Sequence, residues 1–184
     1  MIQKFNKLML VWLLVLLLFS CNSSPSLQEY YVNNAENPNF IALDLPVSLL
    51  NLENVNLTSA QKEALNSLKK LNVLAFRKTS DNDIAYKEEK EKVSAILKDK
   101  HFIELMKLNS GFGKGVIKYI GDDDAIDEVI IYADRQDKGF ALVRVLGSDM
   151  NPANLMQLLQ ALEKSNYKGE GLEGIQKLLT EALD

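Results

Sequence analysis

The stretch GVIKYIGDDDAIDEVIIYADRQDKGFALVRVLG, residues 115–147, decides the fold class. Three runs rich in β-branched and aromatic residues lie in it and predict strands, at residues 115–120, 128–133 and 140–146. Only turn signals at residues 121–124 and 137–139 separate them. Such short connections join antiparallel neighbours, because parallel strands need a crossover of a dozen residues or more. We therefore expect an antiparallel meander at the centre of the chain.

Signals on both sides of this stretch predict the other elements. Further β-rich runs lie at residues 40–45, 73–77 and 102–108, the last joined to the meander across Ser110-Gly111. A helix is predicted at residues 27–34 and a single helical turn at residues 47–52. Three further helices are predicted from their start signals: a capping box at Thr58–Gln61, Asp81 or Asp83 for a helix that runs to about residue 100, and Asn151-Pro152. Together they predict an α+β domain over residues 27–165: an antiparallel sheet of four to six strands with helices packed on one face.

Apolar residues at helical spacing indicate the buried side of each helix. They are Leu27, Tyr30 and Tyr31 on the first; Ala60, Ala64, Leu65, Leu68 and Leu71 after Thr58; Ile84, Val93, Ile96 and Leu97 on the next; and Leu155, Leu158, Leu159 and Leu162 after Pro152. The alternating charges of residues 87–92 predict a solvent-facing side.

The first twenty residues have the pattern of an export signal. Lys4 and Lys7 form a positive start, and the apolar run at residues 8–19 suits a signal peptide and is shorter than the roughly 20 residues that span a bilayer. Leu18-Phe19-Ser20-Cys21 then resembles a bacterial lipobox. The resemblance implies cleavage between Ser20 and Cys21, and acylation of Cys21. The alternatives are an ordinary signal peptide before a chance cysteine, or a short buried helix.

Composition narrows the classes of function. The chain carries 21 Lys+Arg against 25 Asp+Glu, and loss of Lys4 and Lys7 would make the mature chain more acidic. This balance gives no electrostatic reason to expect a nucleic acid or an anionic lipid surface as a partner. Cys21 is the only cysteine, so no disulfide can form within the chain. With His101 as the only histidine, a zinc site is not expected, and no metal or organic cofactor is predicted.

Three segments suggest chemistry, and each has a simpler interpretation. Residues 111–115 (GFGKG) lack the spacing of a phosphate-binding loop and predict a flexible turn. The acidic residues at 122–124, 127 and 128 lack the glycine and the final glutamate of a calcium loop and predict a solvated hairpin tip. A catalytic triad would have to use His101, but the sequence contains no G-x-S-x-G nucleophile motif. His101 is therefore expected to be an ordinary residue at the end of a helix. No catalytic residue is assigned, and a carboxylate pair of the glycosidase type stays open.

The order of these segments resembles a known family. A lipobox and a short helix are followed by NFIALDLP (residues 39–46), a helix, LNVLAF (residues 71–76), a charged helix and residues 116–162. This order is similar to a Bacteroidota lipoprotein family called domain of unknown function 4252. The similarity is greatest at residues 116–162, where EVIIYAD would pair with GFALVRVLG before a closing helix. The resemblance implies an envelope lipoprotein with an α+β domain, and it carries over no reaction and no active-site residue.

The residues after the cysteine bear on location. We expect residues 1–20 to be removed as a signal peptide and residues 21–26 to form a short lipid-anchored tether, held by acyl chains such as palmitate. Asn22 stands where aspartate would retain a lipoprotein in the inner membrane. Residues 22–26 also lack the acidic stretch that marks surface export in the bacterial group that the resemblance implies. We therefore expect an outer-membrane anchor with the domain facing the periplasm.

The end of the chain predicts a separate element. Residues 166–184 form a glycine-containing linker and an amphipathic helix over residues 172–183, with Ile175, Leu178, Leu179 and Leu183 on its apolar side. Packing on the domain's own helices is favoured over docking into a partner. The expected function is non-enzymatic binding of a protein or other ligand near the membrane. The alternatives are a hydrolase that uses paired carboxylates, and a structural or chaperone-like envelope protein.

Overall fold

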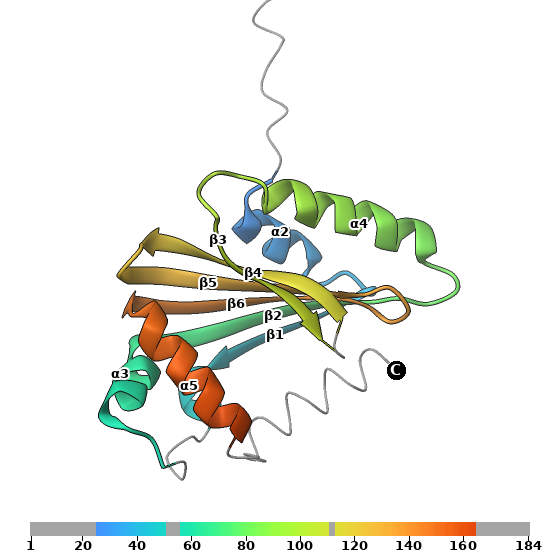
Figure 1. Ribbon diagram of the computed structural model, residues 1–184. Coiled ribbons are helices and arrows are strands. Elements are labelled where there is room, and N and C mark those ends of the chain that lie inside the picture. Colours follow the sequence, from blue (N-terminus) through green and yellow to red (C-terminus); the bar gives the residue numbers. More distant parts are fainter. Residues whose placement is uncertain (1–24, 51–55, 111–112, 165–184) are drawn as a thin grey trace, which may run out of the picture.

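The computed structural model describes residues 25–50, 56–110 and 113–164, which form one sheet flanked by helices (Figure 1). In chain order the elements are α2 (Leu27–Asn34), β1 (Phe40–Pro46), the 3-10 turn η1 (Val47–Leu50), α3 (Ser59–Ser67), β2 (Leu68–Arg77), α4 (Asp83–Ile96), β3 (Ile103–Ser110), β4 (Gly113–Asp122), β5 (Ala125–Arg135), β6 (Gly139–Met150) and α5 (Pro152–Lys164). The predicted α+β class is confirmed.

The sheet contains six strands in the order β1-β2-β6-β5-β4-β3, and every neighbouring pair is antiparallel. Strands β3 to β6 form the predicted meander. β6 then pairs with β2, which joins the first two strands to the meander. This contact depends on Gly139, which has a φ of +123° and where a Cβ atom would lie 2.0 Å from the carbonyl oxygen of Phe76 on β2. Only glycine fits there without strain.

α2 and α3 each begin with a capping box, which was predicted for α3. The Ser26 and Thr58 side chains each accept a hydrogen bond from the third helical residue, whose own side chain accepts one from the backbone of the cap. The helix after Thr58 is shorter than its predicted apolar stripe, however. It ends at Ser67, and Leu68 and Leu71 belong to β2, where they pair with β6.

α4 differs from its prediction at several points. Its N-cap is Asn82, not Asp81 or Asp83, and it ends at Ile96 rather than near residue 100. Ile84 was assigned to the buried stripe and is 75% exposed. Glu89, within the run assigned to solvent, is buried and accepts a hydrogen bond of 2.8 Å from the Tyr30 hydroxyl. The buried face therefore includes one acidic residue, because α2 supplies a partner for it.

α2 and α4 lie on one side of the sheet, which we call the upper face after the view in Figure 1. The larger part of the core lies beneath them. Its centre is aromatic: Phe76 of β2 stacks on Phe140 of β6 with 5.5 Å between ring centroids, and Phe40 of β1 packs edge-on against both. Tyr30 of α2 and Tyr86 of α4 extend this cluster into the helices. Burial of these rings holds both helices on the sheet.

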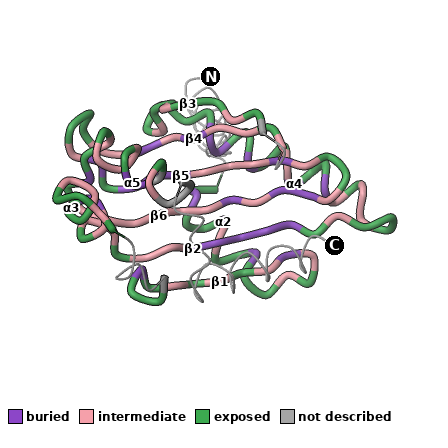
Figure 2. Tube along the Cα trace, turned by 60° about the horizontal axis from the view of Figure 1, so that its bottom comes forward, coloured by how far each residue is buried: buried purple, intermediate pink, exposed green. Residues whose placement is uncertain are grey.

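α3 and α5 lie on the opposite face, the lower face, and cover one end of it (Figure 2). There Leu155 of α5 packs against a second cluster that includes Ile126, Val129 and Met150. The helices therefore occupy both faces, whereas packing on one face was expected. Residues 72–76 of β2 are all buried, without the alternation of a strand that has one face in contact with water.

Several predictions concern residues outside the described ranges. These are the signal peptide, the cleavage site at Ser20 and Cys21, most of the tether, the end of the turn at residues 47–52, residues 111–112, and the linker and helix after residue 165. The helices within the described ranges include none that has the length and apolar character of a membrane span.

Candidate functional site

Beyond α2 and α4, the upper face carries a line of polar side chains that crosses four strands. We call it the polar row; its members are Asp44 of β1, Lys70 and Asn72 of β2, Arg144 of β6 and Glu128 of β5. Strand register sets them side by side, because Asp44 pairs with Asn72, and Asn72 with Arg144. They share the face of the buried Leu74 and Leu142, since side chains alternate along a strand.

Two ion pairs stand at the ends of the polar row. Arg144 donates to both carboxylate oxygens of Glu128, with 2.8 Å between Nη2 and Oε2. Lys70 Nζ lies 2.8 Å from Asp44 Oδ2, and the Asn72 amide donates to the other Asp44 oxygen. The side chains of Arg144 and Glu128 are 18% and 9% exposed, those of Lys70 and Asp44 43% and 63%. The row thus runs from a shielded ion pair to an open one.

Asp44 and Arg144 are charged at neutral pH. Hydrogen bonds from Lys70 and Asn72 hold the pKa of Asp44 below its usual value. The hydrogen bond to Glu128 raises the pKa of Arg144. Because the charged forms are the hydrogen-bonded ones, the row presents fixed charges to a ligand.

α2 stands beside the polar row and forms one wall of a groove of about 530 Å³. Val32, which is 68% exposed, and Ala42 and Leu146 add apolar surface to the charged floor. Tyr31 joins this wall to the sheet, because its hydroxyl lies 2.8 Å from the carbonyl oxygen of Leu142 and 3.3 Å from that of Asn72. The groove therefore offers hydrogen-bond donors, acceptors and apolar contacts in one place.

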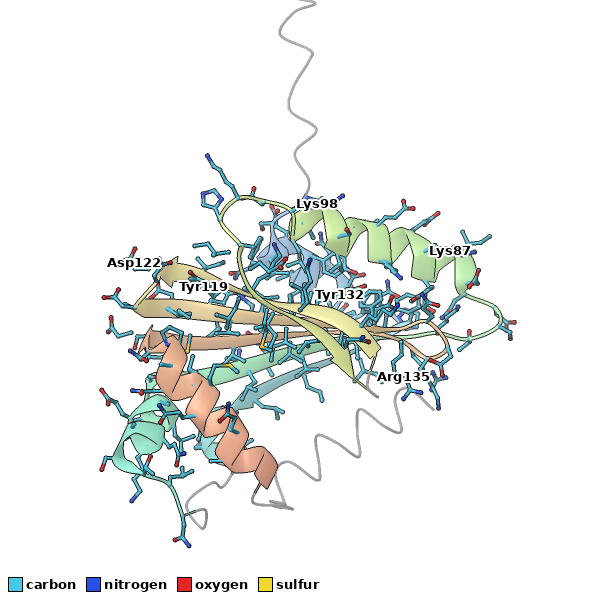
Figure 3. All side chains as sticks on the ribbon, in the orientation of Figure 1. Lys87, Lys98, Tyr119, Asp122, Tyr132 and Arg135 are labelled. Carbon is cyan, nitrogen blue, oxygen red and sulfur yellow. The ribbon has the colours of Figure 1, made fainter. Side chains whose placement is uncertain are left out.

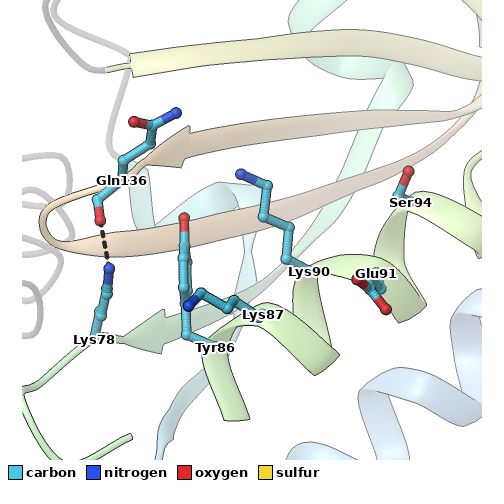
Figure 4. Close-up of a pocket in the computed structure, with 7 residues that line it drawn as sticks. All are labelled: Lys78, Tyr86, Lys87, Lys90, Glu91, Ser94 and Gln136. Carbon is cyan, nitrogen blue, oxygen red and sulfur yellow. Dashed lines mark hydrogen bonds between the residues drawn. The ribbon is translucent and has the colours of Figure 1, made fainter. Parts of the chain in front are cut away.

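A second hollow, of about 470 Å³, lies between α4 and the turn that joins β5 to β6 (Figure 4). Lys78, Lys87 and Lys90 line it around Tyr86, and Lys78 Nζ lies 4.6 Å from the Tyr86 ring centroid. Each lysine has an acidic partner: Lys78 and Lys87 share Asp83 at 3.0 and 2.7 Å, and Lys90 pairs with Asp134. Together with Glu91, which also lines the hollow, these two aspartates balance the three lysines, and this weakens the attraction for an anion.

Asp134 connects α4 to the sheet beside this hollow. The Tyr86 hydroxyl donates to Asp134 Oδ1 at 2.5 Å, and burial together with this hydrogen bond raises the pKa of Tyr86. Tyr132, two residues earlier on β5, has a buried hydroxyl with no hydrogen-bond partner among the described residues. Burial also raises the pKa of Tyr132. These tyrosines therefore stay protonated and serve the packing of α4.

The acidic residues at the β4–β5 hairpin have two different roles. The aspartates at 122, 123, 124 and 127 are exposed, as predicted for a hairpin tip, where Figure 3 labels Asp122. Asp123 accepts a 2.6 Å hydrogen bond from Tyr119. Glu128 was grouped with them, and this assignment is wrong. It points into the upper face and binds Arg144. A bulge between Ile126 and Glu128 in the β5–β6 pairing separates the two environments.

His101 and the glycine segment were the other sequence candidates. His101 lies in the exposed turn before β3 instead of at a helix end, because α4 already ends at Ile96. Its Nδ1 is 2.6 Å from Asp99 Oδ1, and hydrogen bonds from His101 lower the pKa of Asp99. Gly113 and Gly115 belong to β4, while residues 111–112 are outside the described ranges.

The buried carboxylates have separate partners. Among the described residues these carboxylates are Glu89, bound by Tyr30 and Lys92; Glu128, bound by Arg144; and Asp134, bound by Tyr86 and Lys90. Glu128 and Asp134 are six residues apart on β5, about 20 Å in an extended strand, well beyond a glycosidase pair. Within the described ranges, no three His, Cys, Asp or Glu residues come together in a way that could hold a metal ion.

Comparison with protein families gives a match that covers most of the described sheet and helices. Residues 30–158 match the family described as domain of unknown function DUF4252. The chain belongs to this family. The DUF4252 domain runs from α2 into α5, and so it includes all six strands and the whole polar row. No curated protein and no solved structure matches the chain.

Sequence reasoning missed the polar row, although the DUF4252 domain contains a signal for it. In LNVLAF, Asn72 is in phase with the buried Leu74 and Phe76, and in GFALVRVLG, Arg144 is in phase with Phe140 and Leu142. A polar residue at a core phase needs a partner when it is buried. Identifying that partner required the register between strands that are far apart in the chain.

Proposed function

We propose that this protein is a lipid-anchored protein of the bacterial envelope whose DUF4252 domain binds a polypeptide segment in the groove beside α2. The observation that carries the proposal is the polar row, a line of charged side chains and an amide beside the apolar core of the upper face. Asp44 and Lys70 are its accessible end. The domain would act by binding and not by catalysis.

The chemistry of the groove suits a polypeptide. A peptide backbone presents both donors and acceptors, and a binding surface must satisfy both when water is displaced. Lys70 and Asn72 supply donors, and Asp44 supplies an acceptor. Val32 and Leu146 add contacts for an apolar side chain. The combination resembles the apolar and polar mixture of transient protein interfaces.

The position of the groove suits an anchored protein. α2 starts at Leu27, only six residues after the proposed acylated Cys21. A fully extended tether over residues 21–26 reaches about 20 Å, so the groove would stay close to the membrane surface. The partner would therefore be a segment of another envelope protein that is presented near the same membrane.

The test is site-specific photocrosslinking in intact cells that make the full chain. A photoreactive amino acid at Val32 should give adducts of discrete mass, because this side chain is exposed at the groove. The same amino acid at Ile84, which is also exposed but lies on α4 outside the groove, serves as the matched control. Ala42→Trp should fill the groove and reduce the Val32 adducts at least about tenfold, which corresponds to 1.4 kcal/mol of binding.

Ala153→Trp controls for the added ring, because Ala153 is exposed on α5, on the other face. It should leave the adducts unchanged. Equal adducts from Val32 and Ile84, or adducts that persist in the Ala42→Trp variant, would refute binding in the groove.

A further inference from the structure

The lower face of the sheet is apolar well beyond the area that α3 and α5 cover. Past the end where Leu155 packs, the side chains that point down include Ile41 of β1, Val73 and Ala75 of β2, Ala141 and Val143 of β6, and Ala133 of β5. We call these six residues the apolar strip. It crosses four neighbouring strands without a charged or polar member.

Part of the apolar strip is deeply buried. Val73 is 2% exposed and Ala75 is 0% exposed. Both point to the lower face, since their neighbours Leu74 and Phe76 point into the upper core. Among the described elements, only α3 and α5 lie on the lower face, at its other end (Figures 1 and 2). A side chain on a bare sheet face would keep contact with water, so the strip requires a cover.

We propose that residues 172–183 of this chain are that cover, lying as a helix across the apolar strip. Leu172, Ile175, Leu178, Leu179 and Leu183 recur at spacings of three and four residues, which places them on one apolar side of a helix. Twelve helical residues are about 18 Å long. Four adjacent strands span about 14 Å between the outer two, so the lengths agree.

The connection has sufficient reach. α5 ends at Lys164, and residues 165–171 can extend over about 23–25 Å. α5 starts at the end of β6 and runs along the lower side toward the middle of the sheet in Figure 1. A linker of this length also gives a high effective concentration, which favours the chain's own segment over a second copy or a partner.

The cover lies outside the part that the family shares. The DUF4252 match ends at residue 158, within α5, so residues 172–183 would complete the core from beyond it. The sequence analysis favoured packing of residues 172–183 on the domain's own helices; in this proposal the segment packs on the sheet instead. The inference concerns the lower face and does not depend on binding in the groove above.

The first test is a disulfide in the full, membrane-anchored chain. Val143→Cys combined with Leu179→Cys should form an intramolecular disulfide, identified by peptide mass so that Cys21 is distinguished. Val143→Cys combined with Lys177→Cys is the matched control, because Lys177 lies on the opposite side of the helix. Linkage at least about tenfold weaker is expected there. Equal linkage in both, or linkage only between two chains, would overturn the proposal.

The second test needs no cysteine. Leu178→Asp should lower the melting temperature of the full chain by about 5 °C or more, because a charge would enter an apolar contact. Lys177→Gln lowers the net charge by the same one unit on the opposite side of the helix and should shift the melting temperature by less than about 1 °C. An unaltered melting curve for Leu178→Asp would contradict the proposal. Loss of the Val32 adducts alone would not, because these report only on the groove.

Discussion

At the scale of single residues, the polar groups on the upper face were the hardest feature to predict. Alternation within each strand identifies Phe40, Leu74 and Phe140 as core residues. It also places Asn72 and Arg144 on the core side of their strands, but it gives no partner for them, and the acidic run around residue 124 led to Glu128 being assigned to the solvated hairpin tip. The partner is set by the pairing of β2 with β6 and of β6 with β5. Local pattern thus indicates where a polar group is buried, and only the register shows what satisfies it.

The importance of a partner for a buried polar group can be tested by replacing Tyr86 and Tyr132, separately, with phenylalanine. Tyr86→Phe removes the donor to the buried Asp134, and we expect a loss of about 1–2 kcal/mol in the free energy of unfolding. Tyr132→Phe removes a buried hydroxyl that lacks a partner in the described structure, and we expect a gain of up to about 1 kcal/mol. Urea unfolding of both variants measures the difference. Equal losses would show that the Tyr132 hydroxyl is satisfied after all.

At the scale of elements, the sequence predicted the type of each described helix and strand but misplaced some boundaries. Leu68 and Leu71 continue the helical spacing of Ala64 and Leu65, so local pattern extends α3 by four residues. The same leucines fit a strand equally well, and pairing with β6 decides the matter. Propensity is weak compared with a full ladder of hydrogen bonds and the packing of two neighbouring strands.

The side of α4 that faces the core can be tested by substitution. Ile96 is 3% exposed and packs in the upper core, whereas Ile84 on the same helix is 75% exposed. Ile96→Ala should lower the free energy of unfolding by about 2–5 kcal/mol, because it leaves a cavity. Ile84→Ala should change it by less than about 0.5 kcal/mol. Thermal or urea unfolding measures both. A large loss at Ile84 would mean that this side chain contacts something when the protein is in solution.

At the scale of the whole molecule, the meander was predictable and the complete sheet was not. Short turns fix β3 to β6, while the position of β1 and β2 depends on a contact between β2 and β6, which α4 and β3 to β5 separate in the chain. That contact places Asn72 beside Arg144 and so creates the polar row. The offset of the helices, α2 and α4 above and α3 and α5 below, leaves a polar area on one face and an apolar one on the other. Both proposals arise from this offset.

Location is also a property of the whole molecule, and it gives the last prediction. The hypothesis is that Cys21 is acylated, and that the domain faces the periplasm from the inner leaflet of the outer membrane. Its basis is the lipobox-like LFSC at residues 18–21, Asn22, and the lack of acidic residues in the short tether. Cys21→Ser should leave an uncleaved precursor that incorporates no labelled palmitate, because no thiol remains for lipid transfer.

Protease treatment then determines the side of the membrane. A protease added to intact cells should leave the acylated chain whole, because the outer membrane excludes it. The same protease should digest the chain once that membrane is opened, and a known surface lipoprotein should be digested in both cases. Normal processing of Cys21→Ser would refute the anchor. An extended tether of about 20 Å keeps the domain on the side of the membrane where its lipid is inserted. Rapid digestion in intact cells would therefore mean that the anchored chain lies on the cell surface, and that surface export depends on something other than residues 22–26.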